Sequence, residues 1–235
     1  MEVFKGIPIT HPDLAGYEPV TLWHRQLEAA PARGDMPENR HVLFRTTFRY
    51  EGGRVRIRLS ADDYFKLYIN GKFVTQGPAP GFDFRYYYME ADITDYLHPG
   101  ENTAAFHTYY QGLINRVWCS GDNRHMLIFD ILADGHVLAA SGEGVKCAFH
   151  TGYTALSTFG YDTQFAECYR AAAPEVGFEA PAFDDSGWCH AAPSRATYTF
   201  EKQPTEPLTM ETVCPAKVRR TADGLFADFG QMVVG

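Results

Sequence analysis

One stretch of the sequence, SADDYFKLYINGKFVTQGPAP (Ser60–Pro80), constrains the fold more than any other. Its first half alternates apolar and mostly polar side chains with the period of two that a half-buried strand requires. Asn70-Gly71 follows, and both residues tolerate the positive φ of a tight type I′ turn. Gly77-Pro78 then ends the return strand. The stretch predicts a β-hairpin with an inner face of Phe65, Leu67 and Ile69 and an outer face of Tyr64, Lys66, Tyr68 and Asn70.

Short strand-like segments of the same kind continue through most of the chain, and no long amphipathic helix interrupts them. This pattern predicts an all-β protein, built as an antiparallel β-sandwich or jelly roll. Outside the hairpin, strands are expected at 42–50, 54–61, Thr103–Tyr110, Met126–Leu132, Val137–Ala140, Val145–Phe149 and Arg195–Phe200.

Composition divides the chain into four parts. Residues 1–40 are rich in proline and predict an irregular arm that packs on the sandwich, with one helix-compatible piece at Leu22–Ala30. Residues 41–200 are expected to form the sandwich, with 150–180 as a long excursion over its surface. The polar segment 201–207 (EKQPTEP) predicts a linker. Residues 208–235 are expected to be the first strands of a second β unit that is cut short at Gly235.

The charge and cysteine content restrict the class of partner and the compartment. The 235-residue chain has a formal net charge of −8, which disfavours nucleic acid and anionic membrane as main partners but is compatible with a neutral sugar. It has no apolar run long enough to span a bilayer and no recognisable secretion signal. The five cysteines, without a CxxC pair, predict free thiols in a reducing compartment rather than a disulfide framework or a zinc site. We therefore expect a cytoplasmic protein.

Three separated motifs resemble the N-terminal region of bacterial α-L-rhamnosidases, which are glycoside hydrolases. They are ADDYFKLYINGKFVTQGPAPG (61–81), AFDDSGW (182–188) and ADFGQMVVG (227–235), and DITDYLHPGENTAAFHTYY (92–110) is similar to a further stretch of that family. The resemblance covers roughly residues 40–235 in order, although Met232 stands where the family usually has asparagine. It implies a galactose-binding-like β-sandwich followed by the start of a second β-sandwich.

The resemblance also implies that the chemistry of the family lies in another part of the enzyme. α-L-Rhamnosidases hydrolyse terminal α-L-rhamnosides with inversion, using two carboxylates of an (α/α) helical barrel. This chain has no run of amphipathic helices for such a barrel, so we expect no catalytic residue in it. The resemblance therefore predicts a non-catalytic accessory module that supports the barrel, contacts the catalytic and β-sandwich domains of the same polypeptide and helps to bind a rhamnose-containing glycan. The alternative is a free-standing carbohydrate-binding module or lectin.

A sugar site requires an exposed aromatic ring that stacks on a pyranose and planar polar groups that bind its hydroxyls. The cluster that best meets this requirement lies within 109–124, where a loop at the end of the sandwich would present it. In the alternative interpretation, the tryptophan of this cluster packs in the core or against other domains. The candidate glycan contacts are Tyr109, Tyr110, Trp118, Asp122, Asn123 and Arg124.

Two acidic pairs, Asp62-Asp63 and Asp184-Asp185, offer the oxygen ligands that Ca²⁺ prefers. Both are expected at strand ends, where capping of backbone N–H groups explains the carboxylates equally well. In the FDDSGW corner, Asp185 and Ser186 are expected to cap the backbone and Trp188 to pack inward. No other metal and no cofactor is expected.

Overall fold

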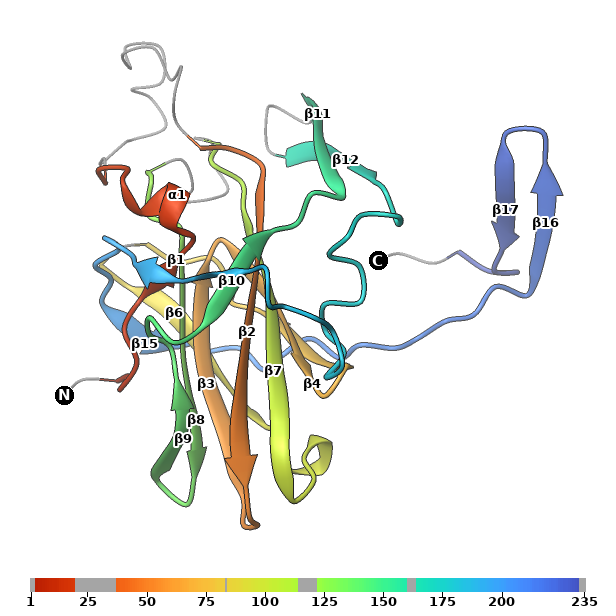
Figure 1. The fold of residues 1–235 in the computed structure, drawn as a ribbon. Coiled ribbons are helices and arrows are strands. Elements are labelled where there is room, and N and C mark those ends of the chain that lie inside the picture. The colour runs from red at the N-terminus through yellow and green to blue at the C-terminus, as the bar shows by residue number, and fades with distance from the viewer. Residues whose placement is uncertain (1–2, 20–36, 83, 114–121, 160–163, 233–235) are drawn as a thin grey trace.

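The protein is a β-sandwich of two sheets (Figure 1). The computed structural model describes residues 3–19, 37–82, 84–113, 122–159 and 164–232. All pairs within the two sheets are antiparallel except β15 with β6, so the predicted all-β sandwich is confirmed.

The seven-stranded sheet has the order β14 (Ala192–Pro193), β1 (Ile9–Thr10), β8 (Met126–Ala133), β3 (Val55–Asp62), β6 (Tyr86–Asp92) and β15 (Phe200–Lys202), with β9 (His136–Ala140) paired to β8. The six-stranded sheet has the order β13 (Cys189–His190), β10 (Lys146–Phe149), β2 (Arg40–Tyr50), β7 (Gly100–Tyr110), β4 (Tyr64–Ile69) and β5 (Lys72–Gly77).

The hairpin that dominates the sequence forms as predicted. Strands β4 and β5 pair antiparallel, and Asn70 (φ 50°) and Gly71 (φ 81°) make the turn between them. The register shifts after Leu67, where a bulge interrupts the ladder. The inward side chains of β4 are buried, whereas Tyr64 and Lys66 are exposed on the other face.

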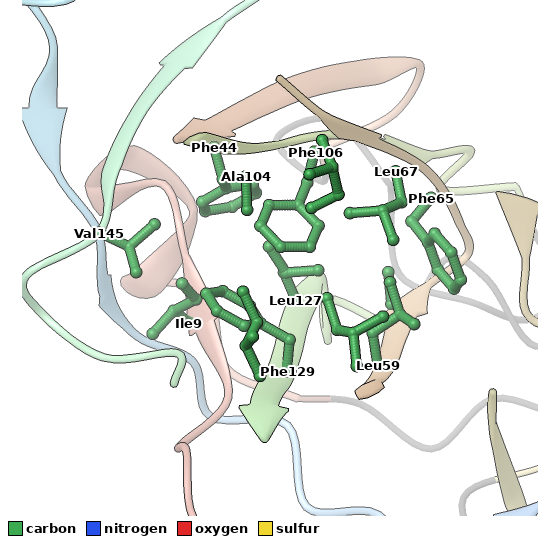
Figure 2. Close-up of a cluster of buried hydrophobic side chains, with 14 of the residues drawn as sticks. Ile9, Phe44, Leu59, Phe65, Leu67, Ala104, Phe106, Leu127, Phe129 and Val145 are labelled. Atoms are coloured by element: carbon green, nitrogen blue, oxygen red, sulfur yellow. The ribbon is translucent and has the colours of Figure 1, made fainter. Parts of the chain in front are cut away.

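The main core lies between the two sheets (Figure 2). Its side chains come from β3 and β8 of one sheet and from β2, β4 and β7 of the other. Near its centre the fully buried rings of Phe106 and Phe129 stack with their centroids 4.5 Å apart, which joins β7 to β8. Complete burial of one such ring stabilises the fold by about 3 kcal/mol.

The N-terminal arm contributes a strand to the sandwich. Strand β1 lies between β8 and β14 in the seven-stranded sheet. Just before it, the carboxylate of Asp130 accepts hydrogen bonds from the backbone N of Lys5 at 2.8 Å and of Gly6 at 2.7 Å. The helix expected at Leu22–Ala30 lies outside the described residues.

Helices are short in the part of the chain that the structure describes. Helix α1 (Pro12–Ala15) follows β1, and the 3₁₀ helix η2 (Thr94–Tyr96) forms in the DITDYL segment. None of the described helices is long and apolar enough to cross a membrane.

Two segments differ from the prediction. Residues 150–180, expected as an irregular excursion, contain a hairpin of β11 (Tyr153–Phe159) and β12 (Gln164–Tyr169). The strand expected at Arg195–Phe200 lies later, as β15, and it enters the segment expected as a linker. Its residues pair with β6 from Tyr86 onward, so tertiary pairing rather than local alternation determines where this strand lies.

The C-terminal segment forms a separate hairpin of β16 (Lys217–Thr221) and β17 (Gly224–Asp228), which Figure 1 shows apart from the sandwich. Every residue of these two strands is exposed. Several large apolar side chains of the segment are exposed as well: Leu208, Met210, Val218, Leu225, Phe226 and Met232.

Candidate functional site

The outer face of the six-stranded sheet carries a patch of aromatic and histidine side chains. His41 on β2 lies directly opposite Tyr109 on β7, and Tyr109 lies opposite Tyr64 on β4. His107, two residues before Tyr109, lies opposite Lys66. Because residues two apart in a strand point to the same face, the antiparallel register gathers all five side chains.

The β11–β12 hairpin lies beside this patch and completes a pocket of about 360 Å³. That volume is within the range of small-molecule binding sites. Besides the patch itself, the strands and their ends contribute Asn39, Gln76 and Gln111, and the hairpin contributes Tyr153, Gln164, Phe165 and Glu167.

A stack of rings joins the sheet to the hairpin in this pocket. The ring of His41 lies 3.8 Å from that of Tyr153 between centroids, with 9° between their planes, and 4.5 Å from that of Tyr109, with 27° between the planes. The Tyr109 hydroxyl donates a hydrogen bond to Oδ1 of Asn39 at 3.0 Å. These contacts orient the rings before any ligand arrives, which reduces the entropy that binding must remove.

The histidines of the pocket are neutral at neutral pH. Nδ1 of His41 and Nε2 of His107 are 2.9 Å apart, a hydrogen bond in which one ring donates and the other accepts. Burial, and then the positive charges of His150 and Lys66, lowers the pKa of His41 to about 3. Burial also lowers the pKa of His107 well below its ordinary value.

The remaining lining groups are mainly neutral hydrogen-bonding groups. Burial raises the pKa of Tyr64 and of Tyr153 to about 12, so both hydroxyls keep their protons. Glu167 is the one carboxylate among the described lining residues, and glycoside hydrolysis by acid–base catalysis requires two. The pocket therefore has the chemistry to bind a neutral, hydroxyl-rich ring.

The tyrosines predicted as glycan contacts lie on opposite sides of β7. Tyr109 lines the pocket. Tyr110 points to the other face of the strand, where it is fully buried, and its hydroxyl accepts a hydrogen bond from the backbone N of Asn123 at 2.9 Å. Trp118 lies outside the described residues.

The predicted polar contacts gather beside Tyr110, away from the pocket. Arg124 Nε donates to Oδ2 of Asp122 at 2.7 Å, and its guanidinium carbon lies 4.9 Å from the centroid of the Tyr198 ring. Burial raises the pKa of Asp122 to about 6, even though Arg124 acts in the opposite direction. The Asn123 side chain donates to the backbone O of Glu18 at 3.0 Å. These contacts hold residues 122–124, just before β8, against the rest of the protein.

The oxygens of the first acidic pair bind partners within the protein. Asp62 accepts hydrogen bonds from the hydroxyls of Tyr86 at 3.0 Å and Tyr198 at 2.6 Å. Asp63 accepts one from the backbone N of Gln111 at 2.7 Å. Burial, and then the negative charge of Asp63, raises the pKa of Asp62 well above its ordinary value.

The second acidic pair divides between two roles. Asp184 is exposed and accepts a hydrogen bond from the backbone N of Ser186 at 3.0 Å, as expected of a capping residue. Asp185 does not cap the backbone as predicted, because its two oxygens instead bind Arg45 and Lys146, each at 2.8 Å. Among the described residues, neither pair belongs to a group of three or more metal-ligand side chains.

Of the residues that line the pocket, only Tyr109 was predicted from the sequence as a glycan contact; His41, His107 and Tyr153 are among those that were missed. Side chains two apart in a strand point to the same face, so His107 could have been placed beside Tyr109 within the strand predicted at Thr103–Tyr110. His41 and Tyr153 join the site through pairing and folding that no local pattern indicates.

Comparison with solved structures places the fold. A GH78 family rhamnosidase from Bacillus sp. GL1 matches with a TM-score of 0.75 and 24% identity, over 94% of this chain and 22% of that one. The chain has the fold of an α-L-rhamnosidase region. The α-L-rhamnosidases of Dictyoglumus thermophilum and Aspergillus terreus match with TM-scores of 0.66 and 0.63, each at 20% identity, over 97% of this chain and 26% of theirs. This chain thus spans about a quarter of the length of these enzymes. No family model and no curated protein sequence matches it.

Proposed function

We propose that this chain is a non-catalytic β-sandwich module of an α-L-rhamnosidase-like glycoside hydrolase, and that it binds carbohydrate in the pocket between β4, β7 and the β11–β12 hairpin. The observation that carries the binding proposal is the chemistry of the lining. Aromatic rings, neutral imidazoles and side-chain amides converge on one pocket of about 360 Å³.

A sugar ring presents apolar C–H faces and an equator of hydroxyls, and the pocket complements both. Tyr64, with 37% of its surface exposed, offers a ring for stacking. Gln76 and Gln164 offer side chains that can both donate and accept hydrogen bonds. Neutral histidines at the base of the pocket avoid the desolvation of a charge when a neutral ligand enters.

The proposal for the parent enzyme rests on the sequence motifs and on the shared fold. In that enzyme, the inverting hydrolysis of terminal α-L-rhamnosides belongs to a catalytic (α/α) barrel elsewhere in the polypeptide. The exposed apolar side chains of the β16–β17 segment, such as Leu225 and Phe226, favour contact with other domains of the same chain.

Calorimetry tests the binding proposal. The 235-residue chain is titrated with L-rhamnose and with a panel of neutral mono- and oligosaccharides. We expect saturable binding that Tyr64→Ala weakens about tenfold, the equivalent of about 1.4 kcal/mol for one aromatic contact. The matched control is Tyr87→Ala, because Tyr87 lies on β6 of the other sheet and should leave affinity unchanged.

Four outcomes separate the alternatives. Flat titrations with every sugar would contradict glycan binding. Loss of binding in Trp118→Ala, with Tyr64→Ala unaffected, would move the site to the 109–124 cluster. Sugar binding by this chain in a gene that encodes no helical barrel would favour a free-standing carbohydrate-binding module or lectin. Turnover of a nitrophenyl α-L-rhamnoside by the chain itself would refute the non-catalytic role.

A further inference from the structure

Three ligand-type side chains from distant parts of the sequence meet at one edge of the six-stranded sheet. Cys147 on β10 lies directly opposite Cys189 on β13, and their Sγ atoms are 3.5 Å apart. His11, the N-cap residue of α1, has its Nε2 3.5 Å from the Sγ of Cys189. All three ligand atoms lie within 4.8 Å of one another, and no other such group occurs among the described residues.

These separations fit the geometry of a tetrahedral zinc site. With Zn–S bonds of about 2.3 Å and a Zn–N bond of about 2.1 Å, tetrahedral angles put two sulfurs about 3.8 Å apart and a sulfur and a nitrogen about 3.6 Å apart. Two observed separations, both 3.5 Å, differ from these values by only a few tenths of an ångström. Small side-chain rotations are therefore enough to bring the three atoms around one ion.

The surroundings also suit a metal ion. His11 and Cys147 are buried, whereas Cys189 is exposed, so an ion can reach the group from solvent on the Cys189 side. The His11 ring is held by stacking on Phe149, with centroids 4.0 Å apart. Nδ1 of His11 now accepts a hydrogen bond from the backbone N of Asp13, and the Asp13 carboxylate lies 3.8 Å from it. When Nε2 binds a metal, Nδ1 carries the proton, so it must exchange the hydrogen bond from the Asp13 backbone for one that it donates to the Asp13 carboxylate, the usual kind of acceptor.

We propose that His11, Cys147 and Cys189 bind one Zn²⁺ ion through Nε2 and two thiolates, with water completing the tetrahedron. The two thiol protons pass to solvent when the ion binds. The ion ties together the N-terminal arm, the sheet and the segment after the FDDSGW corner. This proposal is independent of the glycan pocket.

Metal titration tests the site. The reduced chain, freed of metal by a chelator, is titrated with Zn²⁺ against a chromophoric competitor and, separately, with Co²⁺. We expect one bound ion per chain, a thiolate-to-cobalt charge-transfer band with the intensity of two sulfurs, and a rise in the unfolding midpoint when Zn²⁺ is added. Cys189→Ser should weaken zinc binding more than about 100-fold, because even an outer-shell partner of a ligand is worth about 10- to 100-fold.

The matched control is Cys168→Ser, since Cys168 is an exposed cysteine of β12 outside the group. It should bind zinc like the original chain. His11→Gln supplies a second variant, which should keep the charge-transfer band of two thiolates but bind Zn²⁺ more weakly. Circular dichroism must show that each variant is folded. No binding by the folded original chain, or equal binding by folded Cys189→Ser, would overturn the proposal. So would a Cys147–Cys189 disulfide that persists in the reduced preparation.

Discussion

Substitution of Asp185 by alanine tests the idea that the FDDSGW corner is anchored to the sheet by charge. Asp185 Oδ2 accepts from Nε of Arg45 at 2.8 Å, and Oδ1 accepts from Nζ of Lys146 at the same distance. Arg45 has only 4% of its surface exposed and also donates to the backbone O of Phe178 and, at 3.1 Å, of Ala180. The carboxylate therefore neutralises a buried cation.

The expected cost follows from leaving that cation without its counter-ion. Removal of one partner from a buried ion pair costs about 3–5 kcal/mol. The Asp185 side chain is 25% exposed, and two carbonyl oxygens still bind Arg45, so we take the lower end, about 3 kcal/mol. For a domain of this size, this corresponds to a fall of about 6–12 °C in the unfolding midpoint.

Urea unfolding measures the loss of free energy, and thermal unfolding measures the fall in the midpoint temperature, each followed by tryptophan fluorescence and circular dichroism. Asp184→Ala is the control, because Asp184 is the exposed neighbour in the same motif and should move the midpoint far less. A double-mutant cycle with Arg45→Met should recover part of the loss, since a buried pair can be replaced by apolar groups at little cost. Equal destabilisation by the two aspartate variants, or a coupling free energy near zero, would refute the role of the ion pair.

The same pair has a defined pH dependence. Burial alone would raise the pKa of Asp185, but hydrogen bonds from Lys146 and Arg45 outweigh it and lower the pKa. A carboxyl group with a lowered pKa in the folded state stabilises the fold above its unfolded pKa. That contribution is lost as the pH falls through the folded pKa. The difference between the original chain and Asp185→Ala should therefore shrink in acid.

Three further substitutions test the core, the turn and the buried histidine. Phe129→Ala should cost about 3–5 kcal/mol in the free energy of unfolding, because it removes a fully buried ring stacked on Phe106; a loss below 1 kcal/mol would contradict the central position of this stack. Gly71→Ala should cost about 1–2 kcal/mol in urea unfolding, because alanine is strained at φ 81°, and an unchanged midpoint would count against the observed turn. Burial lowers the pKa of His125 to about 3, so below pH 6.5 the unfolded chain binds a proton that the folded chain does not. The free energy of unfolding should therefore fall by about 2 kcal/mol between pH 6.5 and pH 5 because of this residue. His125→Gln should reduce this dependence of stability on pH.

Local alternation predicted the faces of single strands correctly. Phe65 and Leu67 are buried and Tyr64 is exposed, because the side-chain period of a strand is a property of the backbone itself. The Asn70-Gly71 turn was predicted correctly for the same reason, because it depends only on two adjacent residues. The candidate pocket was only partly predictable, because the row of His41, Tyr109 and Tyr64 depends on the pairing of β2 with β7 and of β7 with β4.

Long-range partners explain what the sequence did not reveal. The role of Asp185 depends on Arg45, which is 140 positions away, and a local pattern indicates only the capping that Asp184 performs. Cys147 and Cys189 are 42 positions apart and become neighbours only through the pairing of β10 with β13. Their spacing gave no sign of a metal site.

The position of β1 has a consequence for biosynthesis. Ile9 is held between Leu127 and Pro193, so the seven-stranded sheet cannot close until the chain beyond residue 193 is available. Strand β15 extends this requirement to Lys202. At about 5–20 residues per second, a ribosome needs about 3–12 s to extend the chain from the end of β8 to β14. Throughout this interval the edge of β1 that later binds β14 lacks its partner, and such an edge is where association with other chains begins.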